Sequence, residues 1–279
     1  MARELRRLLI APPRLAAADT DPPRLALSAD ERHYLERVLR YGHGDRFAVV
    51  DGQGHRWSAQ LLPGGLAQLE QPLAAPLEVQ PQPRPTLVLA AAVVKRDYEQ
   101  VVRMAVELGV DRLIPLISEH SAVQGQLRGD RWRTIAVEAA EQSERLWLPT
   151  IDPPTPLVEL MAADTNHEAS SAGGSVVGPV IRLWCTTRNP DLPGLLDRLL
   201  GAGTGSDRSS ALDTPSATSP DALWLACGPE GGWSLHEDAQ AAEAGWQAVQ
   251  MGPRILRSST ASVCALGAIS LWRARLFGC

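Results

Sequence analysis

The chain has 279 residues, 44% of them hydrophobic, which suits a soluble globular protein with two modest domains or one large domain. Its 27 lysine and arginine residues and 32 aspartate and glutamate residues give a net charge of −5 at pH 7. This charge argues against a protein that coats nucleic acid through bulk positive charge, although a local basic groove remains compatible with it.

Targeting and metal-binding signals are absent from the sequence. No stretch approaches the roughly 18 apolar residues of a transmembrane helix. The apolar stretch before Pro12 is too short for a secretory signal peptide, so we expect a cytoplasmic protein. The cysteines lack paired metal-ligand spacing, so we expect reduced, mainly buried thiols, no disulfide framework and no metal site. The cysteines are Cys185, Cys227, Cys264 and Cys279.

Residues 1–78 predict a small, mostly β domain. Residues 46–50 and 56–61 read as two strands, and the loop at 51–54 has the composition of a hairpin turn. Prolines then accumulate over residues 71–85, where they stiffen a linker and oppose helix formation. We place the domain boundary in this linker. Its prolines are Pro72, Pro76, Pro81, Pro83 and Pro85.

One helix is predicted within this first domain. Ser28 and Glu31 have the spacing of a capping box, and the apolar pattern continues through Arg40. Basic residues gather on and after this helix. They fit either a solvated charged face or an RNA-binding surface, and the residues alone favour neither. These candidate RNA-binding residues are Arg32, His33, Arg37, Arg40 and Arg46.

Residues 79–279 alternate strand and helix, which predicts a mainly parallel α/β sheet with covered faces. The expected strands are residues 86–94, 112–117, 180–185, 222–227 and 247–251. The expected helices are residues 97–108, 130–146, a helix that begins after the capping-box residue Ser234, and residues 258–276. Two stretches rich in small and polar residues, near 164–178 and 201–219, are predicted to be mobile surface insertions.

The last helix, residues 258–276, is apolar nearly all round, which predicts burial on most sides. A terminal helix of an ordinary α/β domain lies on the surface, so this one needs extra cover. Threading into a knot or packing against a second subunit would supply it. An ordinary core helix remains the alternative.

Two turns follow strands of the predicted sheet. Residues 227–233 contain three glycines and a proline, and residues 251–257 contain a Gly-Pro-Arg triplet. Turns that follow parallel strands lie on one edge of a sheet, where open α/β folds bind ligands. The loop at 186–189 is a third candidate for the same edge. A plain strand-to-helix connection explains an isolated glycine-rich turn equally well, and no dinucleotide-binding or P-loop motif is present.

These motifs together resemble a known family. The stretches 228–232 and 252–257 are similar to those of the ribosomal small-subunit RNA uridine-N3 methyltransferases, which belong to the SPOUT superfamily. Residues 107–119 and 138–145 also match, and residues 32–35 extend a weaker match into the first domain. The resemblance covers most of the chain.

The resemblance implies a fold, a reaction and partners. It implies a SPOUT-type methyltransferase domain at 79–279, in which the C-terminal segment forms a trefoil knot, and a PUA-like β-barrel at 1–78 for RNA binding. The implied cofactor is S-adenosylmethionine, and the implied substrate is N3 of a uridine in 16S rRNA, within the 30S subunit or as naked RNA. Members of the family are homodimers.

The resemblance also implies which residues form the site. Backbone groups of three loops are expected to hold the cofactor, and glycines allow their close approach. The expected cofactor-binding residues are Cys185, Thr186, Gly228, Pro229, Glu230, Gly231, Gly232, Met251, Gly252, Ile255, Leu256 and Ser258.

Uridine N3 carries a proton and is a poor nucleophile until that proton leaves. A catalyst must therefore align N3 with the methyl group and favour the uridinate, through a base or through positive groups near the ring oxygens. We expect Arg257 and Arg254 to supply the positive charge, with Glu141 and Arg145 assisting. Solvated ion pairs are the alternative reading of the acidic residues.

Two positions depart from the family pattern. Ser259 stands where relatives commonly carry a glutamate after the Ile-Leu-Arg triplet, so no carboxylate can act as base there. His120 replaces a common arginine. The proton acceptor therefore stays open. A related SPOUT enzyme with another RNA substrate, or a non-catalytic RNA-binding assembly factor, remain the alternative functions.

Overall fold

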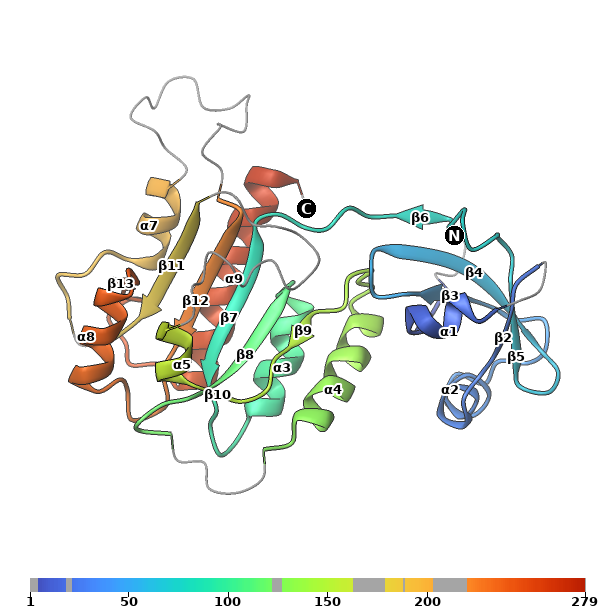
Figure 1. Cartoon of the computed structure of the whole chain (residues 1–279), viewed down its shortest axis with the longest axis horizontal. Coiled ribbons are helices and arrows are strands. Elements are labelled where there is room, and N and C mark those ends of the chain that lie inside the picture. Colours follow the sequence, from blue (N-terminus) through green and yellow to red (C-terminus); the bar gives the residue numbers. More distant parts are fainter. Residues whose placement is uncertain are drawn as a thin grey trace. The chain divides into compact units, whose positions relative to one another are not determined.

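The computed structural model divides the chain into two compact units (Figure 1). Unit 1 comprises Met1–Gln82 and Val137–Leu148, and unit 2 comprises Pro83–Ala136 and Pro149–Cys279. Residues 137–148 fall within the predicted second domain of 79–279, whereas their contacts assign them to unit 1. The structure describes residues 5–18, 22–121, 127–162, 179–187, 189–202 and 220–278.

The two predicted insertions fall largely outside the described residues. This is true of all of 164–178 and of 203–219. The second stretch was predicted to begin at Gly201, but Gly201 and Ala202 form the end of helix α7 (Leu195–Ala202). No helix in the described part of the chain is both long and apolar enough to cross a membrane.

Unit 1 is built on a six-stranded, mostly antiparallel sheet. The strands run in the order β1-β3-β4-β5-β2, with β6 paired to β4, and only β1 and β3 are parallel. The hydrophobic core lies among these strands and includes Phe47 and Leu61. The strands are β1 (Arg7–Leu9), β2 (Arg24–Ala26), β3 (Arg46–Val50), β4 (His55–Leu62), β5 (Leu66–Leu69) and β6 (Glu78–Val79).

The predicted helix of this unit is present but changes its winding. Short α1 (Pro12–Ala16) precedes it. The Ser28 capping box opens α2 (Ala29–His33), as predicted, and η1 (Tyr34–Val38) continues it as a π-helix. The amide of Leu39 donates to the carbonyl oxygen of Tyr34 at 2.9 Å, five residues back. Such wide turns are rare and widen the helix locally.

Unit 2 contains an all-parallel sheet, as the alternation of strands and helices predicted. Its order is β10-β8-β7-β12-β11-β13, with β9 paired to β8. All residues of the central strand β12 are buried, which explains its continuous apolar run. The strands are β7 (Thr86–Ala92), β8 (Arg112–Ile117), β9 (Thr150–Ile151), β10 (Thr155–Pro156), β11 (Val180–Cys185), β12 (Ala222–Cys227) and β13 (Gln247–Val249).

Helices cover both faces of this sheet (Figure 1). Helices α5 (Leu157–Ala162) and α8 (Leu235–Glu243) pack together over one face, where Leu160 and Ala241 join the core. Helix α9 (Ser258–Phe277) packs against β7, β12, α7 and α3 (Tyr98–Glu107). The sheet is therefore one layer of a three-layer α/β unit.

Two helices differ from their predictions. Helix α4 spans Gly129–Gln142 and ends before the predicted residue 146, because Glu144 adopts a φ of 62°. Helix α9 was predicted to be buried on most sides, but the single chain buries only one face of it, including Ala265 and Ile269. Leu271 on the other face is 75% exposed.

A buried ion pair joins α9 to the rest of unit 2. Arg273 donates from Nη1 to Oδ2 of Asp111 at 2.6 Å, and both side chains are less than a tenth exposed. Arg273 also donates to the carbonyl oxygens of Gly109 at 2.8 Å and Pro85 at 3.3 Å. The same Asp111 oxygen accepts from the amide of Leu87 at 2.9 Å. The pair thus links α9 to the start of β7 and to the turn between α3 and β8.

We expect Arg273→Ala to lower the free energy of unfolding by about 3–5 kcal/mol, because Asp111 would remain as an uncompensated buried carboxylate. The matched control is Arg133→Ala, which removes the exposed pair with Asp130 and should cost less than about 1 kcal/mol. Urea titration followed by circular dichroism measures both values. Equal losses in the two variants would contradict the anchoring role of Arg273.

Candidate active site

A cavity of about 420 Å³ lies at the carboxyl ends of β11, β12 and β13. The strands are aligned so that Cys185 pairs with Cys227 on one side and with Val249 on the other. The turns that follow them therefore meet at one edge of the sheet. These turns and the start of α9 form the walls of the cavity.

Ten of the twelve predicted cofactor-binding residues line this cavity. They are Cys185, Thr186, Gly228, Pro229, Gly232, Met251, Gly252, Ile255, Leu256 and Ser258. The two others, Glu230 and Gly231, are exposed residues of the same turn that are not part of the lining. Gly231 lies against His120, whose Nδ1 donates to the carbonyl oxygen of Gly232 at 3.0 Å. His120, the departure from the family pattern, thus contacts the turn from outside.

The turn after β12 is held by a pair of stacked tryptophans. The rings of Trp233 and Trp184 lie 3.8 Å apart between centroids, at an angle of 22°. Trp233 donates from Nε1 to the carbonyl oxygen of Cys185 at 2.8 Å, and Trp184 donates to Oδ1 of Asp238 at 2.8 Å. A Cβ at Gly228 would lie 2.9 Å from the Trp233 ring, so only glycine fits there.

The start of α9 is tied to the same turn. Ser258, which is 5% exposed, donates from Oγ to the carbonyl oxygen of Gly228 at 2.6 Å. One turn later in the helix, Ser262 Oγ donates to the carbonyl oxygen of Ser258 at 2.9 Å. Gly252, in the turn before α9, has a φ of +99°, a conformation that favours glycine. The wall of the cavity at the start of α9 is therefore held by the two serine hydroxyl groups and by the backbone conformation of Gly252.

Gln250 lines the cavity and holds the loop after β11 in place. It is not among the residues expected from the sequence. Its Nε2 donates to the carbonyl oxygens of Leu192 at 2.8 Å and Pro190 at 3.3 Å. Its main chain adds two bonds, from its own amide to Pro193 and from the amide of Leu195 to its carbonyl oxygen. Gln250 thereby joins the turn after β13 to the loop after β11. Thr187 and Asn189 of the loop at 186–189, the third candidate of the sequence analysis, line the cavity as well, although neither is among the twelve expected cofactor-binding residues. Arg188 of this loop lies outside the described residues.

The four predicted catalytic residues are not gathered at the cavity. Arg254 is exposed and contributes to the lining. Arg257 is the exposed N-cap residue of α9 and is not part of the lining. Glu141 and Arg145 belong to unit 1. Of the two arginines in the turn at 251–257, Arg254 therefore lines the cavity, and Arg257 lies next in the chain to the lining residues Leu256 and Ser258.

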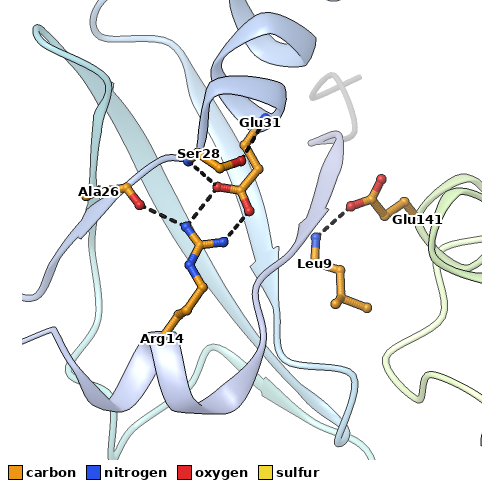
Figure 2. Close-up of polar contacts among 6 residues, drawn as sticks. All are labelled: Leu9, Arg14, Ala26, Ser28, Glu31 and Glu141. Atoms are coloured by element: carbon orange, nitrogen blue, oxygen red, sulfur yellow. Dashed lines mark hydrogen bonds and ion pairs between the residues drawn. The ribbon is translucent and has the colours of Figure 1, made fainter. Parts of the chain in front are cut away.

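Glu141 instead makes a structural contact within unit 1. Its Oε1 accepts from the amide of Leu9 on β1 at 2.7 Å, and Figure 2 shows the carboxylate pointing at this strand. Burial raises the pKa of Glu141 to about 7 against the opposing effect of the Leu9 amide, and the carboxylates of Glu138 and Glu31 raise it further. Glu31 itself is held by Arg14 and by the amide of Ser28 (Figure 2).

The predicted RNA-binding residues all lie in unit 1. Arg32, His33, Arg37 and Arg40 are exposed on or just after α2 and η1. Arg40 has a φ of 57°, an uncommon conformation for a residue other than glycine. Arg46 is also exposed, but its guanidinium pairs with Glu70 and donates to Ser58, so much of its charge is compensated.

Gln250→Leu should lower the free energy of unfolding by about 1–3 kcal/mol, because two loop carbonyl oxygens lose their side-chain donor. The matched control is Gln247→Leu, which removes an exposed contact with Arg198 and should cost less than about 1 kcal/mol. Urea titrations of the two variants and the unmodified chain give the comparison. A loss no larger than that of the control would show that Gln250 does not hold the loop.

The raised pKa of Glu141 predicts a pH dependence of stability. A carboxyl group whose pKa is higher in the folded chain binds its proton more tightly there, so the free energy of unfolding falls as pH rises from 4.5 to about 7. The contribution of Glu141 to this fall is at most about 3 kcal/mol. Glu141→Gln keeps an acceptor for Leu9 and should remove this contribution.

Urea titrations at several pH values across that interval measure the slope. The control Glu36→Gln, on η1 of the same unit, should retain the slope of the unmodified chain. Parallel slopes for Glu141→Gln and the unmodified chain would contradict the assignment.

Comparisons with known proteins place the chain among RNA-modifying enzymes. A family model described as an RNA methyltransferase domain matches residues 80–173 and 197–270, and one described as an RNA methyltransferase PUA domain matches residues 27–65. Over 268 residues the chain is 35% identical to Ribosomal RNA small subunit methyltransferase E of Synechocystis sp., covering 95% of this chain and 77% of that relative.

Two solved structures share the fold. A Ribosomal RNA small subunit methyltransferase E from Neisseria gonorrhoeae, bound to S-adenosyl methionine, matches with a TM-score of 0.69 and 24% identity, covering 96% of this chain and 98% of that one. A methyltransferase from Legionella pneumophila, in complex with the bound cofactor SAM, matches with a TM-score of 0.71 and 22% identity at the same coverage.

Proposed function

Because the chain belongs to the RNA methyltransferase family that includes Ribosomal RNA small subunit methyltransferase E, we propose that it methylates N3 of a uridine in 16S rRNA with S-adenosylmethionine. The single observation that carries this proposal is the cavity at the ends of β11, β12 and β13. It lies where parallel α/β sheets bind ligands, and it is built by the turns through which the family resemblance was identified.

The cavity fits the proposed cofactor in size and in lining. Its volume of about 420 Å³ is within the range of small-molecule sites. Met251, Ile255 and Leu256 supply apolar contact, while Thr186 and Asn189 supply polar groups. Two structures of the same fold were solved with this cofactor bound. We therefore assign the cavity-lining residues to cofactor binding.

The proposed reaction moves one methyl group and one proton. S-adenosylmethionine would supply an electrophilic methyl group. As N3 of uridine forms the new N–C bond, the S–CH3 bond would break and S-adenosylhomocysteine would leave, while the N3 proton would pass to solvent or to a base. Arg254 and Arg257 belong to the turn beside the cavity, where their guanidinium groups can stabilise the negative charge that develops on the uracil oxygens. Ser259 cannot act as a carboxylate base. Stabilisation of the uracil oxygens by Arg254 and Arg257 is therefore the main catalytic contribution in the proposed reaction.

Unit 1 supplies the proposed RNA-binding surface. The PUA-domain match covers α2, η1, β3 and β4. Within it Arg32, Arg37 and Arg40 are exposed, and their planar guanidinium groups suit phosphate contacts. Arg46 makes a weaker case because Glu70 already compensates it. We propose that the first three residues and His33 contact rRNA, and that Arg46 mainly stabilises the sheet.

Two further properties follow from the family resemblance. We propose that the C-terminal segment forms the SPOUT knot and that two copies pair in the cytoplasm. The exposed outer face of α9, with Leu271 and Cys264, supports the second proposal because it offers apolar surface for a partner. The substrate is proposed to be 16S rRNA in the 30S subunit.

The test is methyl transfer from tritium-labelled S-adenosylmethionine to 30S particles and to naked 16S rRNA from a strain that lacks the modification. Label should enter the RNA, and nucleoside analysis should identify N3-methyluridine. Label at another RNA or another uridine position would reject the proposed substrate. Absence of cofactor binding by calorimetry would reject the enzyme itself.

Arg257→Ala should lower the turnover number about 100-fold or more, because a group that stabilises developing charge is lost. Its affinity for S-adenosylmethionine, measured by calorimetry, should change by less than about threefold, since Arg257 is not part of the cavity lining. The matched control is Arg275→Ala, in the exposed last turn of α9, which should keep normal turnover. Normal turnover in Arg257→Ala would refute the role of this arginine.

A further inference from the structure

Two cysteines stand side by side in the cavity. Cys185 ends β11 and Cys227 ends β12, and the two residues are paired in the register of these parallel strands. Both are buried, 9% and 1% exposed, and both are free thiols. Both residues also contribute to the lining of the cavity. The reaction proposed above assigns no chemistry to their sulfur atoms.

The strand register places the two thiols on the same face of the sheet. Directly paired residues of neighbouring strands project to one side, about 4.8 Å apart. A disulfide requires the Cβ atoms to approach to about 3.8 Å, closer than the spacing of the strands. The sheet therefore favours a reduced pair that can still be bridged by one additional atom.

The state of the thiols limits the kind of reagent that can bridge them. The neighbouring thiol of Cys227 raises the pKa of Cys185 well above its ordinary value, and burial raises it further. Reactions that need a free thiolate, such as alkylation or binding of a metal cation, are disfavoured at neutral pH. A reagent that reacts with the protonated thiol of Cys185 is favoured instead.

We propose that Cys185 and Cys227 form a dithiol site that captures trivalent arsenicals inside the cavity. In this step an organic arsenous acid, R–As(OH)₂, reacts with the two thiols. Two As–S bonds form, two As–O bonds and two S–H bonds break, and two molecules of water leave. Arsenic remains trivalent, so the step requires neither oxidant nor reductant.

Capture should also block ligand binding in the cavity. The bridged arsenic and its organic group would occupy space between Thr186, Gly228 and Met251, which line the same cavity. Inhibition of cofactor binding rests on the proposed function, whereas capture itself rests only on the paired thiols. The two can therefore fail separately.

Phenylarsine oxide is the probe, and the background is a full-length chain with Cys264→Ala and Cys279→Ala, which leaves only the paired cysteines. Intact-mass spectrometry in the presence of excess monothiol should show one adduct per chain, removed by the dithiol 2,3-dimercaptopropanol. Adding Cys185→Ala or Cys227→Ala should abolish the monothiol-resistant adduct. Peptide mapping of the unmodified chain should link residues 185 and 227, a measurement that needs no variant to fold.

Three results would overturn the proposal. They are an adduct that maps to Cys264 or Cys279, an adduct that survives in both single-thiol chains, and the absence of an adduct in the two-cysteine background.

Calorimetry with S-adenosylmethionine forms the second arm. The arsenical-treated background chain should bind at least about tenfold more weakly and recover after dithiol treatment, a change of about 1.4 kcal/mol. An adduct without this loss would overturn the overlap with the cofactor site. Absence of binding by the untreated chain would instead reject the proposed function.

Discussion

The in-register parallel alignment of β11, β12 and β13 is the constraint on which the site depends. Cys185 lies level with Cys227 and with Val249, so three strands end at the same height in the sheet. Each strand must then leave that edge, because a parallel neighbour can be reached only by a crossover. Three turns are thereby forced together, and the helices that follow two of them cover opposite faces of the same sheet. The strand alignment that defines the sheet therefore also brings together the turns that form the cavity.

Hydrogen bonds from side chains hold the three turns of the cavity in defined positions. Trp233 and Ser258 donate to carbonyl oxygens of Cys185 and Gly228, and Gln250 donates to two carbonyl oxygens of the loop after β11. Turn carbonyls that would otherwise need water receive protein donors. Each bond also joins two different segments of the cavity wall: the turn after β12 to the end of β11, α9 to the turn after β12, and the turn after β13 to the loop after β11. The cavity walls are consequently fixed before a ligand arrives, which reduces the ordering cost of binding.

The sequence was most informative where local chemistry determines local structure. The apolar run of β12 and the capping boxes at Ser28 and Ser234 are read from neighbouring residues, and the structure has all three as predicted. The family resemblance of the turns also indicated ten of the residues that line the cavity. Gln250 and the Trp184 and Trp233 stack were missed, because their partners lie far away in the chain and have no sequence signal. For α9, composition shows that the helix is apolar but not which neighbours cover it, and the single chain covers only the face that includes Ala265 and Ile269.

The link between Ser258 and Gly228 has a consequence for biosynthesis. β11 and β12 are translated before the segment that holds Met251, Gly252 and Ser258, yet that segment completes the wall of the cavity. A nascent chain that has released only the first two strands from the ribosome exposes an open sheet edge with no finished pocket. The cavity can therefore be completed only late in translation, after the residues at the start of α9 have been synthesised.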